Sequence, residues 1–162
     1  MLGVATVLSW INIVVGGIFL FVQLLGSVMI PDGSAMIVPI LLSGAIILHS
    51  YASMQLRKSI VNPNIPLSSQ TPIGIRFIGF LAMIAGIIFI SSSVWSLQNT
   101  AEIVKQAKLP DMAQLPKGFK IENFFKFFAV VFILISVSII LNVLLNFSLL
   151  RWYLFSKKQE NN

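Results

Sequence analysis

The stretch from Phe124 to Phe155 reads FFKFFAVVFILISVSIILNVLLNFSLLRWYLF, and it decides the fold class. Between Lys126 and Arg151 it contains no charged residue. A helix rises about 1.5 Å per residue, so about 20 apolar residues cross a hydrocarbon core roughly 30 Å thick. We therefore expect a transmembrane helix over 124–155 that is long enough to tilt or to project beyond the bilayer.

Three further stretches have the same apolar character, and they predict helices over 2–30, 35–56 and 73–98. The chain of 162 residues is 57% hydrophobic and 10% charged, whereas soluble domains are roughly 25% charged. A membrane β-barrel would show alternating segments of about ten residues, and this sequence does not alternate. The sequence therefore predicts one all-α integral membrane domain over 1–162, a four-transmembrane-helix bundle.

The connections between these helices differ in length. Residues 31–34, Pro-Asp-Gly-Ser, have the composition of a tight turn, which makes the first two helices an antiparallel hairpin. The connection over 62–72 contains three prolines and is expected to be irregular. The longest connection, 99–123, is expected to lie outside the cytoplasm. It includes a candidate short amphipathic helix that starts with Asn99 as its cap and stops before Pro110.

The orientation follows from the Lys and Arg residues of the short loops. With both termini in the cytoplasm, six basic residues face inward and five face outward, while four of the five acidic residues face outward. We therefore expect both termini to be cytoplasmic, residues 156–162 to form a polar cytoplasmic tail, and the protein to lie in the cell (inner) membrane. The first helix lacks a basic leading segment and a cleavage site, so it is expected to stay uncleaved.

The basic residues on the cytoplasmic side predict contact with anionic lipid headgroups. This expected headgroup set is Arg57, Lys58, Arg151, Lys157 and Lys158. Because the basic residues are divided between two sides of a bilayer and are not interleaved with aromatic residues, no nucleic-acid binding is expected. The absence of cysteine excludes disulfides and thiolate ligands for iron–sulfur clusters.

Polar side chains within the membrane are costly and are therefore candidate functional residues. Four of them fall in the cytoplasmic half of the expected spans, and they form the candidate intramembrane polar cluster: Asn12, His49, Asn142 and Asn146. The last two are four residues apart and share a helix face, which Ser138 extends. The first helix has a matching stripe of small and polar residues, so we expect these two faces to meet.

Two interpretations of this cluster remain open. In the structural one, the side chains hydrogen-bond between helices, each pair contributing roughly 0.5 to 2 kcal/mol. Small residues then allow close packing at Gly16, Gly79, Ala82 and Gly86. In the functional one, His49 contacts a ligand, gates a passage in response to pH or relays protons. The structural interpretation is favoured, because a proton relay normally includes a carboxylate and none is present in the spans.

No catalytic constellation is found in the sequence. His49 is the only histidine, and Asp32 lies roughly 20 Å from it by helix rise, which excludes a Ser-His-Asp triad. One histidine without cysteine does not form a structural zinc or bis-histidine haem site in a single chain. No glycine-rich phosphate loop is present. We therefore expect a non-enzymatic protein without a metal or a cofactor.

Three functional hypotheses follow. The favoured one is an accessory or assembly subunit that packs against another membrane protein or copies of itself through its helices and its outer loop. The alternative is a homo-oligomeric channel or small-solute transporter in which the candidate intramembrane polar cluster forms the constriction. A further alternative is a lipid- or quinone-binding protein with a cleft beside His49. A transport site is expected to be reached by water, whereas a packing site is expected to be dry.

Overall fold

The computed structural model of the chain describes residues 2–29, 33–106 and 120–160. Within these ranges every regular element is a helix, and four helices are long and apolar enough to cross a membrane. The four are α1 (Leu2–Met29), α2 (Ile37–Val61), α3 (Thr71–Gln98) and α5 (Ile121–Glu160). The two short helices are η1 (Gly33–Met36) and α4 (Thr100–Gln106). This is the architecture of a multi-pass membrane protein.

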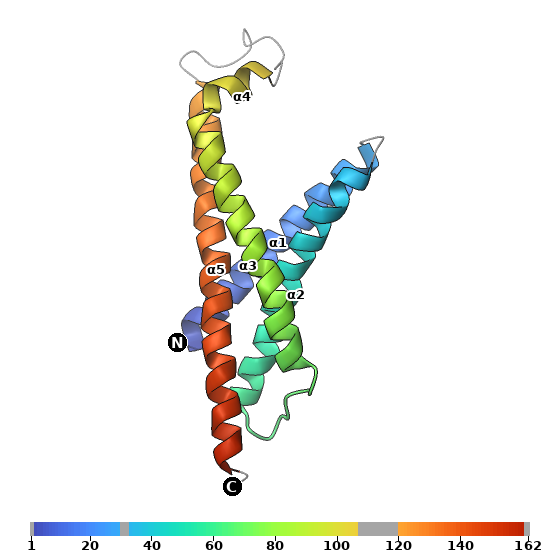
Figure 1. The fold of residues 1–162 in the computed structure, drawn as a ribbon, viewed down its shortest axis with the longest axis vertical. Helices are drawn as coiled ribbons and strands as arrows, with labels where there is room; N and C mark the ends of the chain where they lie inside the picture. The colour runs from blue at the N-terminus through green and yellow to red at the C-terminus, as the bar shows by residue number, and fades with distance from the viewer. Residues whose placement is uncertain (1, 30–32, 107–119, 161–162) are drawn as a thin grey trace.

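The long helices form two pairs that meet at one end and diverge at the other (Figure 1). α1 and α2 form an antiparallel hairpin, and α3 and α5 run side by side in the most extensive contact of the molecule. α2 packs on α3, and α1 crosses α5. We call the half that holds both chain termini the closed end. The half that holds the α1–α2 connection and α4 is the open end.

Three of the long helices extend beyond the spans predicted from the sequence, and α3 does so by two residues, since it begins at Thr71. The helix expected over 35–56 starts at Ile37 and continues to Val61, because no helix-ending residue precedes the Asn62-Pro63 pair. The backbone N–H of Asn62 closes its last turn by donating to the carbonyl of Lys58 at 2.9 Å. α5 likewise extends on both sides of the predicted 124–155.

The long connection contains a short helix, α4, where the sequence predicts one. Asn99 does not cap α4 with its side chain, however. Its Nδ2 atom donates to the carbonyl of Trp95 at 2.9 Å, which satisfies an acceptor in the last turn of α3. Residues 107–119, with Pro110, lie outside the described residues, as do 30–32 of the predicted first turn.

Small residues determine how closely the helices approach one another. A Cβ atom built at Gly16 would lie 2.9 Å from a side-chain atom of α2. One built at Gly79 would lie 2.7 Å from a side-chain atom of α5, and one at Gly86 would lie 2.8 Å from another. Ala82, between these two glycines on α3, is 1% exposed. All four residues expected to permit close packing therefore lie at helix contacts.

An aromatic contact marks the point where the two pairs separate. Phe19 of α1 stacks on Phe132 of α5 with ring centroids 5.4 Å apart, and it meets Phe89 of α3 edge-on at 5.8 Å. The preceding part of α1 presents small side chains to its neighbours, as at Ala5 and Gly16. Phe19 is thus the bulky side chain that α1 presents to α3 and α5 beyond its close contacts at Ala5 and Gly16.

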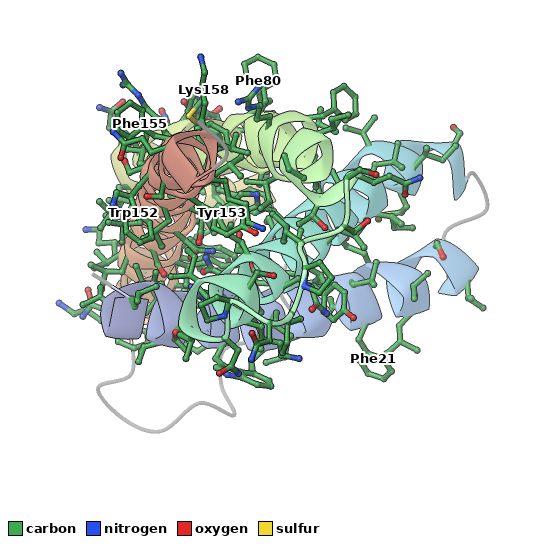
Figure 2. All side chains as sticks on the ribbon, turned by 90° about the horizontal axis from the view of Figure 1, so that it is seen from below. Phe21, Phe80, Trp152, Tyr153, Phe155 and Lys158 are labelled. Carbon is green, nitrogen blue, oxygen red and sulfur yellow. The ribbon has the colours of Figure 1, made fainter. Side chains whose placement is uncertain are left out.

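Large apolar side chains cover the outside of the molecule. Seen from the closed end, Phe21 on α1 and Phe80 on α3 point away from the bundle on opposite sides (Figure 2). Their exposed fractions are 62% and 54%. Apolar exposure on this scale is unfavourable in water and is expected where helices face lipid tails.

Candidate functional site: a buried polar cluster and an apolar cavity

Polar side chains gather inside the closed end, where α1, α2 and α5 meet. All are 5% exposed or less, except Ser138, which is partly buried. They come from α1, α2 and α5, and two groups of hydrogen bonds join them across the helices. We call this set the polar cluster: Ser9, Asn12, Ser50, Arg57, Ser138, Asn142 and Asn146.

Asn142 of α5 is the centre of the polar cluster. Its Oδ1 atom accepts hydrogen bonds from the hydroxyl of Ser9 on α1 at 3.0 Å and from Nδ2 of Asn146 at 2.9 Å. Its own Nδ2 donates to the hydroxyl of Ser50 on α2 at 3.3 Å. A single side chain on α5 therefore connects the α1–α2 hairpin to the α3–α5 pair.

A second hydrogen bond joins α1 to α5. The Ser138 hydroxyl donates to Oδ1 of Asn12 at 3.2 Å. Because Ser9 and Asn12 are three residues apart on α1, and Ser138 and Asn142 are four apart on α5, the two bonds lie one helical turn apart. The small and polar stripe of the first helix and the polar face of the last helix are thus in contact in the structure.

Arg57 of α2 also lies inside the polar cluster. Its side chain is 5% exposed, and Nη2 donates to the Ser9 hydroxyl at 2.7 Å. No carboxylate of the described residues forms an ion pair with it, and the sequence contains no Asp or Glu between Asp32 and Glu102. A buried charge without a counter-ion is costly, so Arg57 is the least compensated group in this part of the molecule.

His49 is buried nearby but makes different contacts. Its ring packs against α3 at Gly79 and meets the ring of Phe147 on α5 edge-on, with centroids 6.2 Å apart. Nε2 lies 3.5 Å from the hydroxyl of Ser53, one turn along α2. The structure therefore joins Asn142 and Asn146 in one hydrogen-bonded network and places Asn12, bonded to Ser138, one turn away. His49 lies beside them, at the α2–α3–α5 contact.

Several buried polar atoms have no hydrogen-bond partner among the described residues. They are Nδ2 of Asn12, Nδ1 of His49, Nη1 of Arg57 and Oδ1 of Asn146. A buried polar group without a partner costs roughly 1 to 3 kcal/mol. The polar cluster therefore holds the helices together but retains unused hydrogen-bonding capacity.

The expected headgroup set is divided by the structure. Arg57 does not fit this expectation, because its side chain is buried and donates a hydrogen bond to Ser9 of α1 instead of facing headgroups. The other members, Lys58, Arg151, Lys157 and Lys158, are exposed. Lys157 also lies over the ring of Tyr153, with Nζ 6.0 Å from the centroid.

The burial of Arg57 was missed because the second helix was predicted to end at Leu56. With that boundary, Arg57 belongs to a loop. In the structure the helix continues, and Ser50, Ser53 and Arg57 follow one another at spacings of three and four residues, so they share a face. This spacing was the signal in the sequence that could have placed Arg57 with the polar residues.

A separate cavity of about 400 Å³ lies toward the open end between α3 and α5. Its walls consist mainly of phenylalanine rings and of three serines, Ser92, Ser93 and Ser96. Phe89 and Phe132, which line it, are also the two rings that Phe19 of α1 contacts. The cavity therefore starts where α1 separates from the α3–α5 pair.

The chain was compared with protein-family models, with curated proteins and with solved structures, and none of the three comparisons found a match. The described residues contain no group of three or more His, Cys, Asp or Glu side chains that could hold a metal ion. The functional conclusions therefore depend on the two features described above, the polar cluster at the closed end and the apolar cavity toward the open end.

Proposed function

We propose that the protein is a non-enzymatic accessory or assembly subunit that binds a transmembrane helix of another membrane protein between its two helix pairs. The observation that supports this most directly is the divergence of the α1–α2 hairpin from α3 and α5 at the open end (Figure 1). The polar cluster joins the two pairs at the closed end, whereas their helices diverge toward the open end.

Two surfaces of the open end fit a helix: the cavity between α3 and α5, and the outer half of the α1–α2 hairpin. The cavity presents Ser92, Ser93 and Ser96, which are small and carry hydroxyl groups. Small residues let helix backbones approach closely in lipid, and hydroxyl groups hydrogen-bond across helix contacts. The outer half of the hairpin also carries exposed apolar residues, such as Val28 at 86% and Leu41 at 65%. An apolar partner helix with a small-residue face would match the serines of the cavity and the apolar surface of the hairpin.

The polar cluster favours this role over a homo-oligomeric channel. Ser9, Ser50 and Asn142 form hydrogen bonds within a single chain, so a pore between copies would have to break these bonds before the same groups could face it. The outer-loop residues 107–119, which the sequence also suggests for docking, lie outside the described residues.

We further propose that the closed end faces the cytoplasm of the cell (inner) membrane. Its exposed basic residues include Lys58, Arg76, Arg151 and Lys157, which fits the excess of Lys and Arg in cytoplasmic loops. Because the chain has no cysteine, a single cysteine at position 64 or 162 can be labelled specifically. Labelling of both positions by a membrane-impermeant thiol reagent in intact cells would contradict this orientation.

Photo-crosslinking tests the proposed helix-binding role. A photoreactive residue replaces Ser92 in the cavity, and the matched control replaces Phe80, which lies on the same helix and points away from the bundle (Figure 2). We expect Ser92 to crosslink one membrane protein of defined mass in native membranes and Phe80 not to do so. An adduct of twice the chain mass would identify a second copy as the partner.

A cavity-filling variant makes the test decisive. Ser92→Trp places an indole in the cavity, and it should prevent copurification of the crosslinked protein while leaving the unfolding temperature nearly unchanged. Crosslinks only to lipid, equal yields from Ser92 and Phe80, or copurification that survives Ser92→Trp would each contradict the proposal. A lipid-only result would instead favour the lipid- or quinone-binding alternative.

A further inference from the structure

Two arginines from different helices line one cavity at the closed end. Arg76 lies in the second turn of α3, and Arg151 lies on α5. Together with Phe147 and Leu150 they surround a space of about 250 Å³. Both arginine side chains are exposed, and neither forms an ion pair within the described residues. The cavity therefore combines two uncompensated positive charges with an apolar wall.

A second cavity adjoins the first at Arg151. It is an open hollow on the surface of α5, lined by Ser148, Arg151, Trp152 and Phe155. Arg151 thus lies between two spaces whose other walls are mainly aromatic or aliphatic. A ligand that contacts both the arginine and the apolar walls must carry a negative group and hydrocarbon in the same molecule.

The position of the two arginines along their helices also matters. α3 begins at Thr71, so Arg76 comes just before its long apolar stretch. On α5, Arg151 ends the uncharged stretch that follows Lys126. Both residues are therefore at the boundary of a predicted span, where lipid phosphates lie.

We propose that Arg76 and Arg151 bind the phosphate of one anionic glycerophospholipid, whose chains lie against Phe147, Leu150 and Trp152. Guanidinium groups bind phosphate through two parallel N–H···O bonds, and basic pockets between transmembrane helices are suited to anionic headgroups. Convergence of two arginines on one cavity separates this site from the diffuse attraction of Lys157 and Lys158. It also lies at the opposite end from the proposed helix-binding surface, so either proposal can fail alone.

Native mass spectrometry of the detergent-purified chain tests this site, with phosphatidylglycerol or phosphatidylcholine added. We expect the wild type to retain one phosphatidylglycerol and to show no comparable binding of phosphatidylcholine. Arg76→Gln with Arg151→Gln should lower the occupancy about tenfold or more, because charge-assisted hydrogen bonds from both guanidiniums are lost. The matched control is Lys157→Gln with Lys158→Gln, which removes the same charge from the same end and should retain the lipid.

A lysine double variant and a test with inorganic phosphate separate a specific phospholipid site from simple charge attraction. Arg76→Lys with Arg151→Lys keeps both charges, so it should fold like the wild type and show intermediate lipid occupancy. Inorganic phosphate should not bind measurably when it is offered alone, and it should not displace bound phosphatidylglycerol, because it lacks the hydrocarbon that the apolar walls contact. Equal losses in the arginine and lysine double variants, equal retention of phosphatidylcholine, or displacement by inorganic phosphate would overturn the proposal.

Discussion

The two ends of this molecule show what holds helices together in lipid. At the closed end, α1 presents small and polar residues such as Ser9 and Gly16, and it contacts its neighbours closely. Toward the open end, the same helix presents the apolar ring of Phe19 to Phe89 of α3 and Phe132 of α5, and beyond this contact it separates from both helices. Lipid tails are as apolar as these side chains, so apolar surface alone gives no reason for helices to associate.

A bulky residue at the tightest helix contact should have the largest effect. Gly79→Leu adds a side chain where even a Cβ atom would lie 2.7 Å from Phe147 and 2.8 Å from His49. Because α3 must then move away from α2 and α5, we expect a loss of about 3 kcal/mol, measured by thermal or chemical unfolding in detergent. The matched control is Gly74→Leu, at a glycine of the same helix with no neighbouring atom within 4 Å. Equal effects of the two variants would contradict the close-packing assignment.

Removal of the hydrogen bonds at the centre of the polar cluster should rank second. Asn142→Leu with Asn146→Leu deletes the bonds that Asn142 makes with Ser9 on α1 and Ser50 on α2. We expect a loss of about 2 kcal/mol and a wider separation of α1 from α5. Spin labels on single cysteines in these two helices report that distance. The control, Asn123→Leu, changes an exposed asparagine of α5 and should leave both quantities unchanged.

The four helices could be predicted because their signal is local, whereas the angle between the two pairs could not. Each apolar stretch exceeds the length that a bilayer requires, as 73–98 and 124–155 do. The divergence depends instead on which side chains meet across α1 and α5. Phe19 contacts Phe89 and Phe132, and the second of these lies more than a hundred positions away in the sequence. The spacing of residues within one helix does not reveal such a contact.

The aromatic junction between the two ends should have a smaller effect. Phe19→Ala removes the stacked contact with Phe132 and the edge contact with Phe89. Aromatic pairs contribute roughly 0.5 to 1.5 kcal/mol each, so we expect the loss of both contacts to cost at least about 1 kcal/mol and to widen the angle between the helix pairs. The control is Phe21→Ala, on the same helix, whose ring points away from the bundle (Figure 2). If both variants unfold at the same temperature, the junction does not hold the pairs together.

The candidate site was predictable where it depended on spacing within one helix. Asn142 and Asn146 lie four residues apart, and their shared face could be read directly. The sequence did not reveal that Asn142 bonds to both α1 and α2, because this depends on how the three helices align with one another along their lengths. Arg57 was assigned to a loop for a different reason, an error of five residues in the end of α2.

Replacement of Arg57 should have the smallest effect on the free energy of unfolding, and whether that free energy rises or falls is informative. Arg57→Met removes one hydrogen bond to Ser9, but it also removes a buried charge that no carboxylate of the described residues compensates. Replacing buried ions with apolar residues of similar volume is often neutral or stabilising. We therefore expect the free energy of unfolding in detergent to stay within about 1 kcal/mol of the wild type or to rise. The control, Lys58→Met, alters the exposed neighbouring cation and should have no effect. A loss as large as that of the double asparagine variant would show that the guanidinium is an essential link of the polar cluster, and the closed end would then depend on a charge as well as on neutral hydrogen bonds.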